Sequence, residues 1–378
     1  HPDRRAAGAQ GGVIYHDGQF DDARLAVALA RTLEDLGGTP LNYVRVTGLV
    51  KEHGLVTGVT ARDEERGEQF VLPARVVVNA TGVFTDGMRR LDEPDCDPLI
   101  VPSQGVHLVL DRSFLPGDSA IMVPHTDDGR VLFAVPWHDR VIVGTTDTPV
   151  GSTPLEPRPL PEEIEFLLAH AARYLTRDPA PGDVLSVFAG LRPLVQSGKG
   201  GTTASLSRDH TLLVSSSGLV TITGGKWTTY RHMGEETVTA AAAVAGLAER
   251  PSVTQELRIH GWSEDTEKGM TGGEYGSDAV EVEGLVAENP AWGGRLHPRL
   301  PYRGVDVIWG VRREYARTVE DVLARRTRAL FLDARASMEM APAVAQLMAS
   351  ELGRDVVWEE AQVDTYRLLA AGYLPTAS

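Results

Sequence analysis

The chain has 378 residues, of which 42% are hydrophobic and 24% are charged, and its formal net charge is −15. This size suffices for two domains with cores of their own, and the acidic balance argues against nucleic acid as a partner, because phosphate backbones are bound by basic surfaces. The single cysteine, Cys96, excludes an internal disulfide framework and fits a reducing compartment. No apolar run approaches the roughly 20 residues that a membrane-spanning helix needs.

The first predicted element is an amphipathic helix over residues 21–36. Leucines recur along it at helical spacing, Asp21 or Asp22 supplies an N-cap, and Gly37-Gly38 ends it. Three strand-like runs follow, separated by glycines and charged residues as in an antiparallel meander. They cover residues 41–49, 55–62 and 69–72.

A short apolar run over residues 75–78 ends in the small residues Ala80, Thr81 and Gly82. We expect a fully buried strand here, because such strands belong to parallel sheets covered on both faces. The carboxyl edge of a parallel sheet is where ligands bind, and Gly82 permits close approach. A plain strand-to-helix turn is the alternative interpretation.

From residue 99 to 143 the sequence changes to the apolar–polar alternation that is typical of an antiparallel sheet. A helix over residues 161–174 follows, with two glutamates in its first turn, and residues 184–190 return to the sheet. The expected core faces are Val106, Leu108 and Leu110, then Val131, Phe133 and Val135, and finally Val141 and Val143.

The most informative stretch is Thr221-Ile-Thr-Gly-Gly-Lys-Trp-Thr-Thr-Tyr-Arg231. A strand over 219–222, paired with 212–214, ends in two glycines, and a helix over 233–244 follows. Such a turn exposes backbone N–H groups and the positive end of a helix dipole, so an anion can bind there. Lys226 adds a full charge. A nucleotide-binding P-loop is excluded, because the spacer that precedes its Gly-Lys pair is missing.

The last third, from about residue 255 to 378, is predicted to form a separate helical domain, because apolar residues keep near-helical spacing from about residue 305 onward. Six arginines between residues 312 and 328 are expected to pair with Glu314, Glu320 and Asp321 rather than to bind a ligand.

Taken together, these motifs resemble the FAD-dependent glycerol-3-phosphate dehydrogenases, which belong to the D-amino-acid-oxidase-like flavoproteins. The resemblance covers nearly the whole chain. The motifs that carry it are Gly11-Gly-Val-Ile-Tyr-His-Asp-Gly-Gln-Phe-Asp-Asp-Ala-Arg24, Val77-Val-Asn-Ala-Thr-Gly82, Pro102-Ser-Gln-Gly-Val-His107, Pro136-Trp137, Gly144-Thr-Thr-Asp-Thr148, Phe188-Ala-Gly-Leu-Arg-Pro-Leu194, Ser207-Arg-Asp-His210, the Gly224-Gly225-Lys226 turn and the segment from Tyr315 to Arg328.

The resemblance implies an α/β (α+β) fold with a Rossmann-like FAD domain, an antiparallel substrate domain and a helical cap. The predicted boundaries are 1–98 for part of the FAD domain, 99–200 for the substrate domain, 201–250 for the closing segment of the FAD domain and 255–378 for the cap. Family members open with a G-x-G-x-x-G turn, which this sequence lacks. We therefore expect the C-terminal part of a longer flavoenzyme, inactive alone. The rival interpretation is a protein that never had that unit.

The resemblance also assigns the site. FAD is expected to contact two segments, Ala80-Thr81-Gly82 and Gly224-Gly225-Lys226-Trp227-Thr228. Substrate is expected to contact Arg192, Arg208, Lys226 and Thr228, and the catalytic residues are His107, Arg192 and Lys226. The proton acceptor is either His107, whose ordinary pKa suits a base near neutral pH, or a cationic side chain. No His or Cys pair has metal-ligand spacing, so no metal is expected.

The implied reaction is oxidation of sn-glycerol 3-phosphate to dihydroxyacetone phosphate, with hydride transfer to flavin and electrons passed to membrane quinone. Two alternatives stay open: a glycerophosphate oxidase that reduces oxygen, and a non-catalytic fragment that cannot hold FAD. The resemblance also implies a homodimer in the cytoplasm, peripheral on the inner face of the cytoplasmic membrane.

Overall fold

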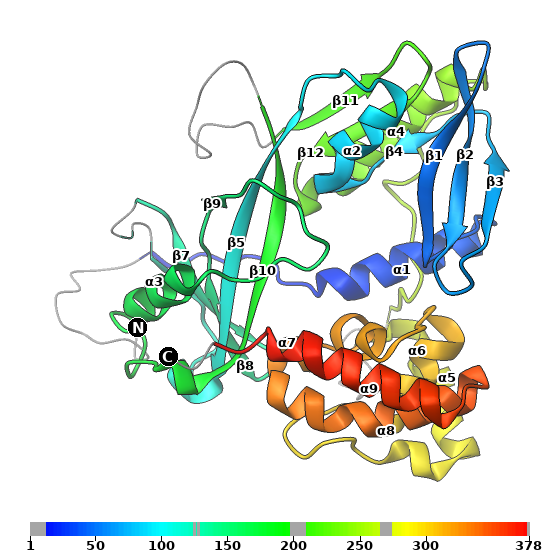
Figure 1. Ribbon diagram of the computed structural model, residues 1–378. Coiled ribbons are helices and arrows are strands. Elements are labelled where there is room, and N and C mark those ends of the chain that lie inside the picture. The colour runs from blue at the N-terminus through cyan, green and yellow to red at the C-terminus, as the bar shows by residue number, and fades with distance from the viewer. Residues whose placement is uncertain (1–12, 124–125, 127–128, 197–208, 265–273, 376–378) are drawn as a thin grey trace.

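The computed structural model describes residues 13–123, 126, 129–196, 209–264 and 274–375 (Figure 1). Helix α1 (Asp22–Asp35) begins at its N-cap Asp21, whose carboxylate accepts the N–H of Arg24 at 3.0 Å. An antiparallel meander follows, in the order β1-β2-β3. It consists of β1 (Val44–Glu52), β2 (Leu55–Asp63) and β3 (Gln69–Pro73). The predicted helix and three strands are confirmed, with ends displaced by up to three residues.

A second small sheet joins distant parts of the chain in the order β11-β12-β4. Strand β12 (Val220–Gly224) is antiparallel to β11 (His210–Val214) and parallel to β4 (Val78–Asn79). The buried strand expected over 75–78 is wrong. Only two residues form β4, and Val78 is 41% exposed, because among the described residues β4 pairs with β12 alone and lies at the sheet edge. The turn η1 (Gly82–Phe84) and helix α2 (Thr85–Asp92) follow it.

The largest sheet has the order β10-β5-β8-β7-β6, with β9 paired to β5. Its strands are β5 (Ile100–Asp111), β6 (Ile121–Val123), β7 (Leu132–Trp137), β8 (Arg140–Gly144), β9 (Thr148–Pro149) and β10 (Val184–Val195). Helix α3 (Pro161–Ala171) packs on one face, over a core that includes Val106, Leu108 and Leu110 as predicted. On β7 the predicted core face is wrong: Leu132 and Ala134 are buried while Phe133 is 37% exposed. A one-residue shift exchanges the two faces of a strand.

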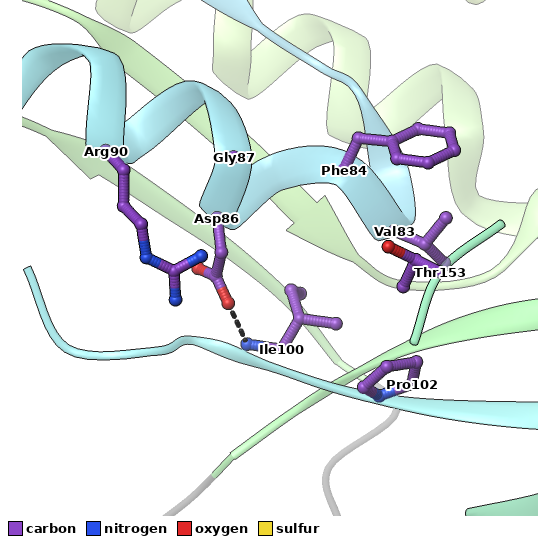
Figure 2. Close-up of a pocket in the computed structure, with 8 residues that line it drawn as sticks. All are labelled: Val83, Phe84, Asp86, Gly87, Arg90, Ile100, Pro102 and Thr153. Atoms are coloured by element: carbon purple, nitrogen blue, oxygen red, sulfur yellow. Dashed lines mark hydrogen bonds between the residues drawn. The ribbon is translucent and has the colours of Figure 1, made fainter. Parts of the chain in front are cut away.

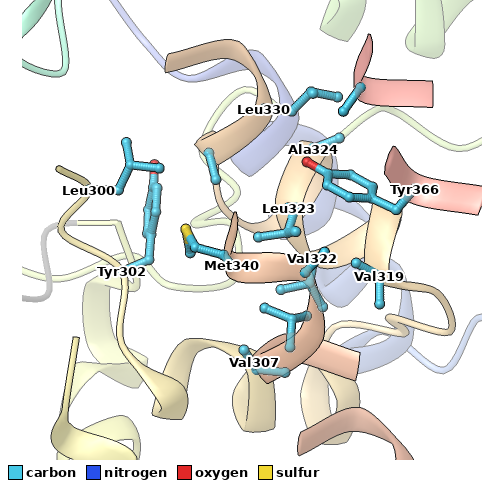
Figure 3. Packing of buried hydrophobic residues seen from close by; sticks show 14 of the residues in the cluster. Leu300, Tyr302, Val307, Val319, Val322, Leu323, Ala324, Leu330, Met340 and Tyr366 are labelled. Atoms are coloured by element: carbon cyan, nitrogen blue, oxygen red, sulfur yellow. The ribbon is translucent and has the colours of Figure 1, made fainter. Parts of the chain in front are cut away.

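The C-terminal third is helical, and its core gathers buried aliphatic and aromatic side chains from several helices (Figure 3). The helices are α5 (Ala279–Glu288), α6 (Gly304–Arg313), α7 (Ala329–Leu332), α8 (Ala334–Leu352) and α9 (Val356–Ala371), with the π-helix η8 (Asp321–Arg326) between α6 and α7. Short 3-10 turns occur at several places along the chain. They are η2 (Arg112–Phe114), η3 (Pro181–Asp183), η5 (Trp227–Thr229), η6 (Gly276–Asp278) and η7 (Pro290–Gly293). Helix α4 (Tyr230–Val244) packs on β11 and β12. The fold class predicted from the sequence, mixed α and β with an antiparallel sheet and a helical C-terminal domain, is confirmed.

Ion pairs tie the helical domain to the first part of the chain, and α1 lies between that domain and the meander (Figure 1). Arg325 pairs with Glu320 as expected, at 2.6 Å. Arg325 and Arg326 also pair with Asp321 as expected, at 3.0 and 3.4 Å. Three other arginines bind carboxylates that were not predicted. Arg312 binds Glu351, Arg317 binds Glu65 and Arg328 binds Asp21. Within the described ranges, no helix is both long and apolar enough to cross a bilayer.

Candidate functional site

His107 and Arg192 lie on the same face of the large sheet. Strands β5 and β10 pair antiparallel, with His107 opposite Phe188 and Ser103 opposite Arg192. Since side chains alternate along a strand, these residues all point away from the core face that α3 covers. The topology therefore gathers a base and a cation on one sheet surface.

The guanidinium of Arg192 lies flat over Gly105. A Cβ at Gly105 would come within 2.3 Å of Nη2 of Arg192, so any side chain there would displace it. Nη1 donates to the backbone oxygen of Thr146 at 3.2 Å, Nη2 donates to Oγ1 of Thr145 at 3.1 Å, and Asp147 lies 3.6 Å from Nη1. The Thr145 and Thr146 oxygens orient the planar guanidinium, and 36% of the Arg192 side chain is exposed to solvent. This geometry suits an incoming oxyanion.

The imidazole of His107 is held between aromatic and backbone surfaces. It stacks on Phe188 with ring centroids 5.3 Å apart, and it covers Gly144, where a Cβ would lie 2.2 Å from the ring. Phe188 in turn meets Phe331 of α7 edge to face at 5.0 Å. Burial, and then the positive charge of Arg192, lower the pKa of His107 to about 4. The ring is therefore neutral near pH 7 and can accept a proton.

This lowered pKa predicts a specific pH dependence of stability. The pKa of His107 falls from 6.5 to about 4 on folding, so between these values the unfolded chain binds the extra proton, and stability is lost as pH falls from about 6.5 to about 4. The loss through this half-buried group should be about 1–2 kcal/mol at pH 4.5. His107→Gln should remove that part of the slope in calorimetric melting curves. Exposed His16→Gln is the control, and an unchanged slope in His107→Gln would contradict the assignment.

The turn after β12 has the conformation expected of a close-approach site. Gly224 and Gly225 both have φ +74°, and a Cβ would lie 2.8 Å from the Asp209 oxygen at Gly224 and 2.5 Å from Sδ of Met233 at Gly225. Both residues must be glycine, because φ is positive and the protein's own atoms fill the space that a side chain would need. A tight turn that leads into a helix can offer backbone N–H groups to an anion.

Exposed side chains follow the two glycines. Lys226, Trp227 and Thr228 are exposed, and the turn is closed by Thr229, whose N–H donates to the Lys226 oxygen at 3.0 Å. In the described part of the chain, the ammonium of Lys226 makes no ion pair. Val195, near the end of β10, lies 2.8 Å from the position of a Gly224 Cβ. The strand that carries Arg192 therefore ends against this turn, although no hydrogen bond of the described residues joins Lys226 or Thr228 to His107 or Arg192.

Two glycines of this region should respond oppositely to alanine. Gly225→Ala forces a side chain into a positive φ and against Met233, and it should destabilise the protein by about 1–2 kcal/mol. Gly234→Ala, on α4 with open space around its Cβ, should stabilise it by up to about 1 kcal/mol. Chemical denaturation measures both. Equal effects would mean that the turn does not hold the conformation described.

The second predicted cofactor segment is ordered by Asn79. Its amide donates to the Thr85 oxygen at 3.1 Å, and its carbonyl accepts Oγ1 of Thr81 at 2.7 Å. Gly82 has φ +58°, and a Cβ placed there would have no other atom within 4 Å, so the Ala80-Thr81-Gly82 backbone is open on this side. A pocket of about 250 Å³ lies beside it, where α2 faces the start of β5 (Figure 2). Its lining is Val83, Phe84, Asp86, Gly87, Arg90, Ile100, Pro102 and Thr153.

Two aspartates that organise this region, Asp86 and Asp147, were not predicted from the sequence. Asp86 accepts the N–H groups of Leu99 and Ile100 at 3.0 Å each. Figure 2 shows the bond to Ile100. Asp147, hydrogen-bonded to Ser103, lies beside Arg192. The signal for Asp147 was its position in Gly144-Thr-Thr-Asp-Thr148, a motif that carried the resemblance but received no role. Arg208, predicted to bind substrate, lies outside the described residues.

Comparison with known proteins matches both parts of this architecture. The profile of the FAD dependent oxidoreductase family matches residues 1–231, and that of the C-terminal domain of alpha-glycerophosphate oxidase matches residues 220–362. The chain is 38% identical to the mitochondrial glycerol-3-phosphate dehydrogenase of Macaca fascicularis over 383 residues, covering 94% of the chain and 52% of the relative. A probable glycerol-3-phosphate dehydrogenase of Caenorhabditis elegans is 40% identical over 392 residues, with 97% and 54% covered.

Among solved structures, the glycerol-3-phosphate dehydrogenase of Bacillus halodurans complexed with FAD superposes with a TM-score of 0.86 at 28% identity. The match covers 100% of the chain and 78% of that protein. The chain spans about half the length of the curated relatives it matches.

Proposed function

The chain belongs to the FAD-dependent oxidoreductase family, and from this premise we propose that it oxidises sn-glycerol 3-phosphate to dihydroxyacetone phosphate. The observation that carries the proposal is the sheet surface on which Arg192 and His107 lie together. Arg192 offers a planar cation that can fork onto phosphate oxygens, and His107 is a neutral imidazole within the electrostatic influence of that cation. A phosphorylated secondary alcohol needs both groups, one for its phosphate and one for its hydroxyl proton.

In this proposal the two glycine-containing turns hold the cofactor. Gly82 has open space at its Cβ position, and in the second turn Lys226, Trp227 and Thr228 are exposed. The positive φ of Gly224 and Gly225 supports the fit, because it holds a tight turn before a helix, where backbone N–H groups can bind an anionic group. When bound, FAD supplies the hydride acceptor.

The remaining roles follow from charge and reach. Lys226 stabilises the negative charge that develops during the reaction, and it contacts substrate together with Thr228, whose hydroxyl can donate a hydrogen bond. Arg192 and Arg208 bind the phosphate. The proton of the substrate hydroxyl goes to a ring nitrogen of His107, which its lowered pKa keeps unprotonated near pH 7.

We propose membrane quinone as the electron acceptor, with the protein peripheral on the inner face of the cytoplasmic membrane and assembled as a homodimer. The names of the relatives, which are dehydrogenases, support quinone over oxygen. The match of residues 220–362 to the C-terminal domain of alpha-glycerophosphate oxidase keeps the oxygen-reducing alternative in consideration.

The test uses the gene product in its full encoded length, purified with FAD. Oxidised flavin absorbs near 450 nm, roughly, and loses that band on reduction. Anaerobic addition of sn-glycerol 3-phosphate should bleach the band, while glycerol and the opposite enantiomer should not. A short-chain quinone should then restore it faster than oxygen does, without peroxide. A flavin band that is bleached by dithionite but not by glycerol 3-phosphate would show that glycerol 3-phosphate is not the substrate. A protein that retains no flavin would support the non-catalytic alternative.

A further inference from the structure

A buried carboxylate lies behind the residues that hold Arg192. Glu163, in the first turn of α3, is 4% exposed and accepts four hydrogen bonds. The donors are Nε2 of Gln104 at 2.8 Å, Oγ1 of Thr146 at 2.8 Å, Oγ1 of Thr148 at 2.7 Å and the N–H of Leu160 at 2.9 Å. Both carboxylate oxygens therefore accept two donors each, and the structure gives this buried group no cationic partner within the described ranges.

Only one of these four hydrogen bonds serves the helix itself. The bond from the Leu160 N–H closes the N-terminus of α3, as acidic residues commonly do at this position. The other three donors lie on the large sheet and on the segment that connects β8 to β9. A capping role alone does not account for them, since an unpaired buried carboxylate is costly unless its hydrogen bonds are made.

Thr146 connects Glu163 to Arg192 through a single residue. Its hydroxyl donates to Glu163 and accepts the N–H of Val106 at 3.0 Å, and its backbone oxygen accepts Nη1 of Arg192 at 3.2 Å. Thr146 is only 2% exposed. The neighbouring Thr145 accepts the other arm of the guanidinium. Displacement of Thr145 and Thr146 would therefore move both threonine oxygens that accept hydrogen bonds from the Arg192 guanidinium.

We propose that Glu163 is a positioning residue for Arg192: it fixes residues 145–148 from the far side of the sheet, so that the guanidinium stays oriented over Gly105 for a phosphate group. The identity of the ligand rests on the proposed function, whereas the mechanical link from Glu163 to Arg192 does not. Glu163 touches neither substrate nor cofactor in this arrangement and acts through Thr146.

The main test is Glu163→Gln, which keeps the shape of the side chain. It replaces one carboxylate oxygen, which accepts two hydrogen bonds, with an amide NH2 group, which donates. In the flavin-loaded protein, KM for glycerol 3-phosphate should rise about 5- to 20-fold, with kcat changing much less, because binding geometry is affected before chemistry. Exposed Glu162→Gln, at the adjacent position of the same helix, is the matched control and should leave both parameters unchanged. If Glu163→Gln does not fold, Thr148→Val removes one donor to Glu163 without touching Arg192, and a smaller rise in KM is expected.

A double-mutant cycle separates positioning from general structural support. In an Arg192→Ala background, Glu163→Gln should have almost no further effect on KM, since residues that act through one another are not additive. An additive effect, or an unchanged KM in the single variant, would overturn the inference.

A measurement without substrate decides the inference even if glycerol 3-phosphate is the wrong ligand. Phenylglyoxal modifies accessible guanidinium groups, and peptide mapping gives the rate at Arg192. This rate should increase several-fold in Glu163→Gln and stay unchanged in Glu162→Gln. An unchanged rate in Glu163→Gln would overturn the positioning role, whereas a wild-type protein that ignores glycerol 3-phosphate but shows the increased rate would overturn only the proposed substrate.

Discussion

Replacing Lys226 with methionine should lower the rate of flavin reduction by about 10²- to 10³-fold, the range seen when one preorganised electrostatic donor is removed. Lys226 is exposed directly after the tight Gly224-Gly225 turn, and within the described residues its ammonium has no ion-pair partner that would neutralise it. Its charge is worth most when negative charge develops in the reaction, so it stabilises the transition state more than the bound substrate. The effect should therefore appear in the chemical step.

Stopped-flow bleaching at saturating substrate measures this step. The flavin should also become harder to reduce, which a redox titration reports. Lys226→Arg keeps the charge at this position and should retain much more of the rate than Lys226→Met. A methionine variant that reduces its flavin at the normal rate and only binds substrate weakly would show that Lys226 is a phosphate anchor. The electrostatic role assigned to the Gly224-Gly225-Lys226 turn would then be wrong.

Arg192→Ala should reduce kcat/KM for glycerol 3-phosphate by about 30- to 1000-fold, which corresponds to roughly 2–4 kcal/mol for a charge-assisted, bidentate contact. Flavin binding should change far less, because Arg192 lies on the sheet surface with His107 rather than on either of the two turns proposed to hold the cofactor. Glycerol should be a poor substrate for the wild-type protein for the same reason, as it has no phosphate for the guanidinium to bind.

Arg192→Lys tests whether the fork matters beyond its charge. A lysine keeps the charge but cannot bridge the Thr145 hydroxyl and the Thr146 oxygen while also binding a phosphate in bidentate fashion. We expect an intermediate loss. Normal efficiency in Arg192→Ala would remove this residue from the site, and full activity in Arg192→Lys would show that only the charge is needed.

Local signals in the sequence were sufficient for much of the fold. The capped helix at 22–35, the meander and the turn at Gly224-Gly225 depend on neighbours a few residues apart, and the structure agrees with them. The errors arose where distant pairing decides the outcome. Phe133 lies on the exposed face of β7 because the strand's register is set by β8, and the near-helical spacing after residue 305 is interrupted by a π-helix.

For the candidate site, the sequence indicated the polar residues but not what holds them. Arg192 and His107 were selected through the family resemblance, and strand alternation then explains why they share a face. Glu163 could be predicted only as a first-turn acidic residue, since its contacts to Gln104, Thr146 and Thr148 cross the sheet. Gly105 offered one usable signal, because a glycine inside a strand often marks close approach of another group.

The pairing of α1 with the helical domain has a consequence during protein synthesis. Arg24 binds Glu314 and Arg328 binds Asp21, so the partners are 290 and 307 residues apart in the chain. At about 5–20 residues per second, α1 leaves the ribosome roughly 15–60 s before its partners exist. Throughout that interval Asp21 and Arg24 lack the partners that they bind in the folded protein. Nascent α1 is therefore a segment on which a ribosome-associated chaperone could act before the last third of the chain arrives.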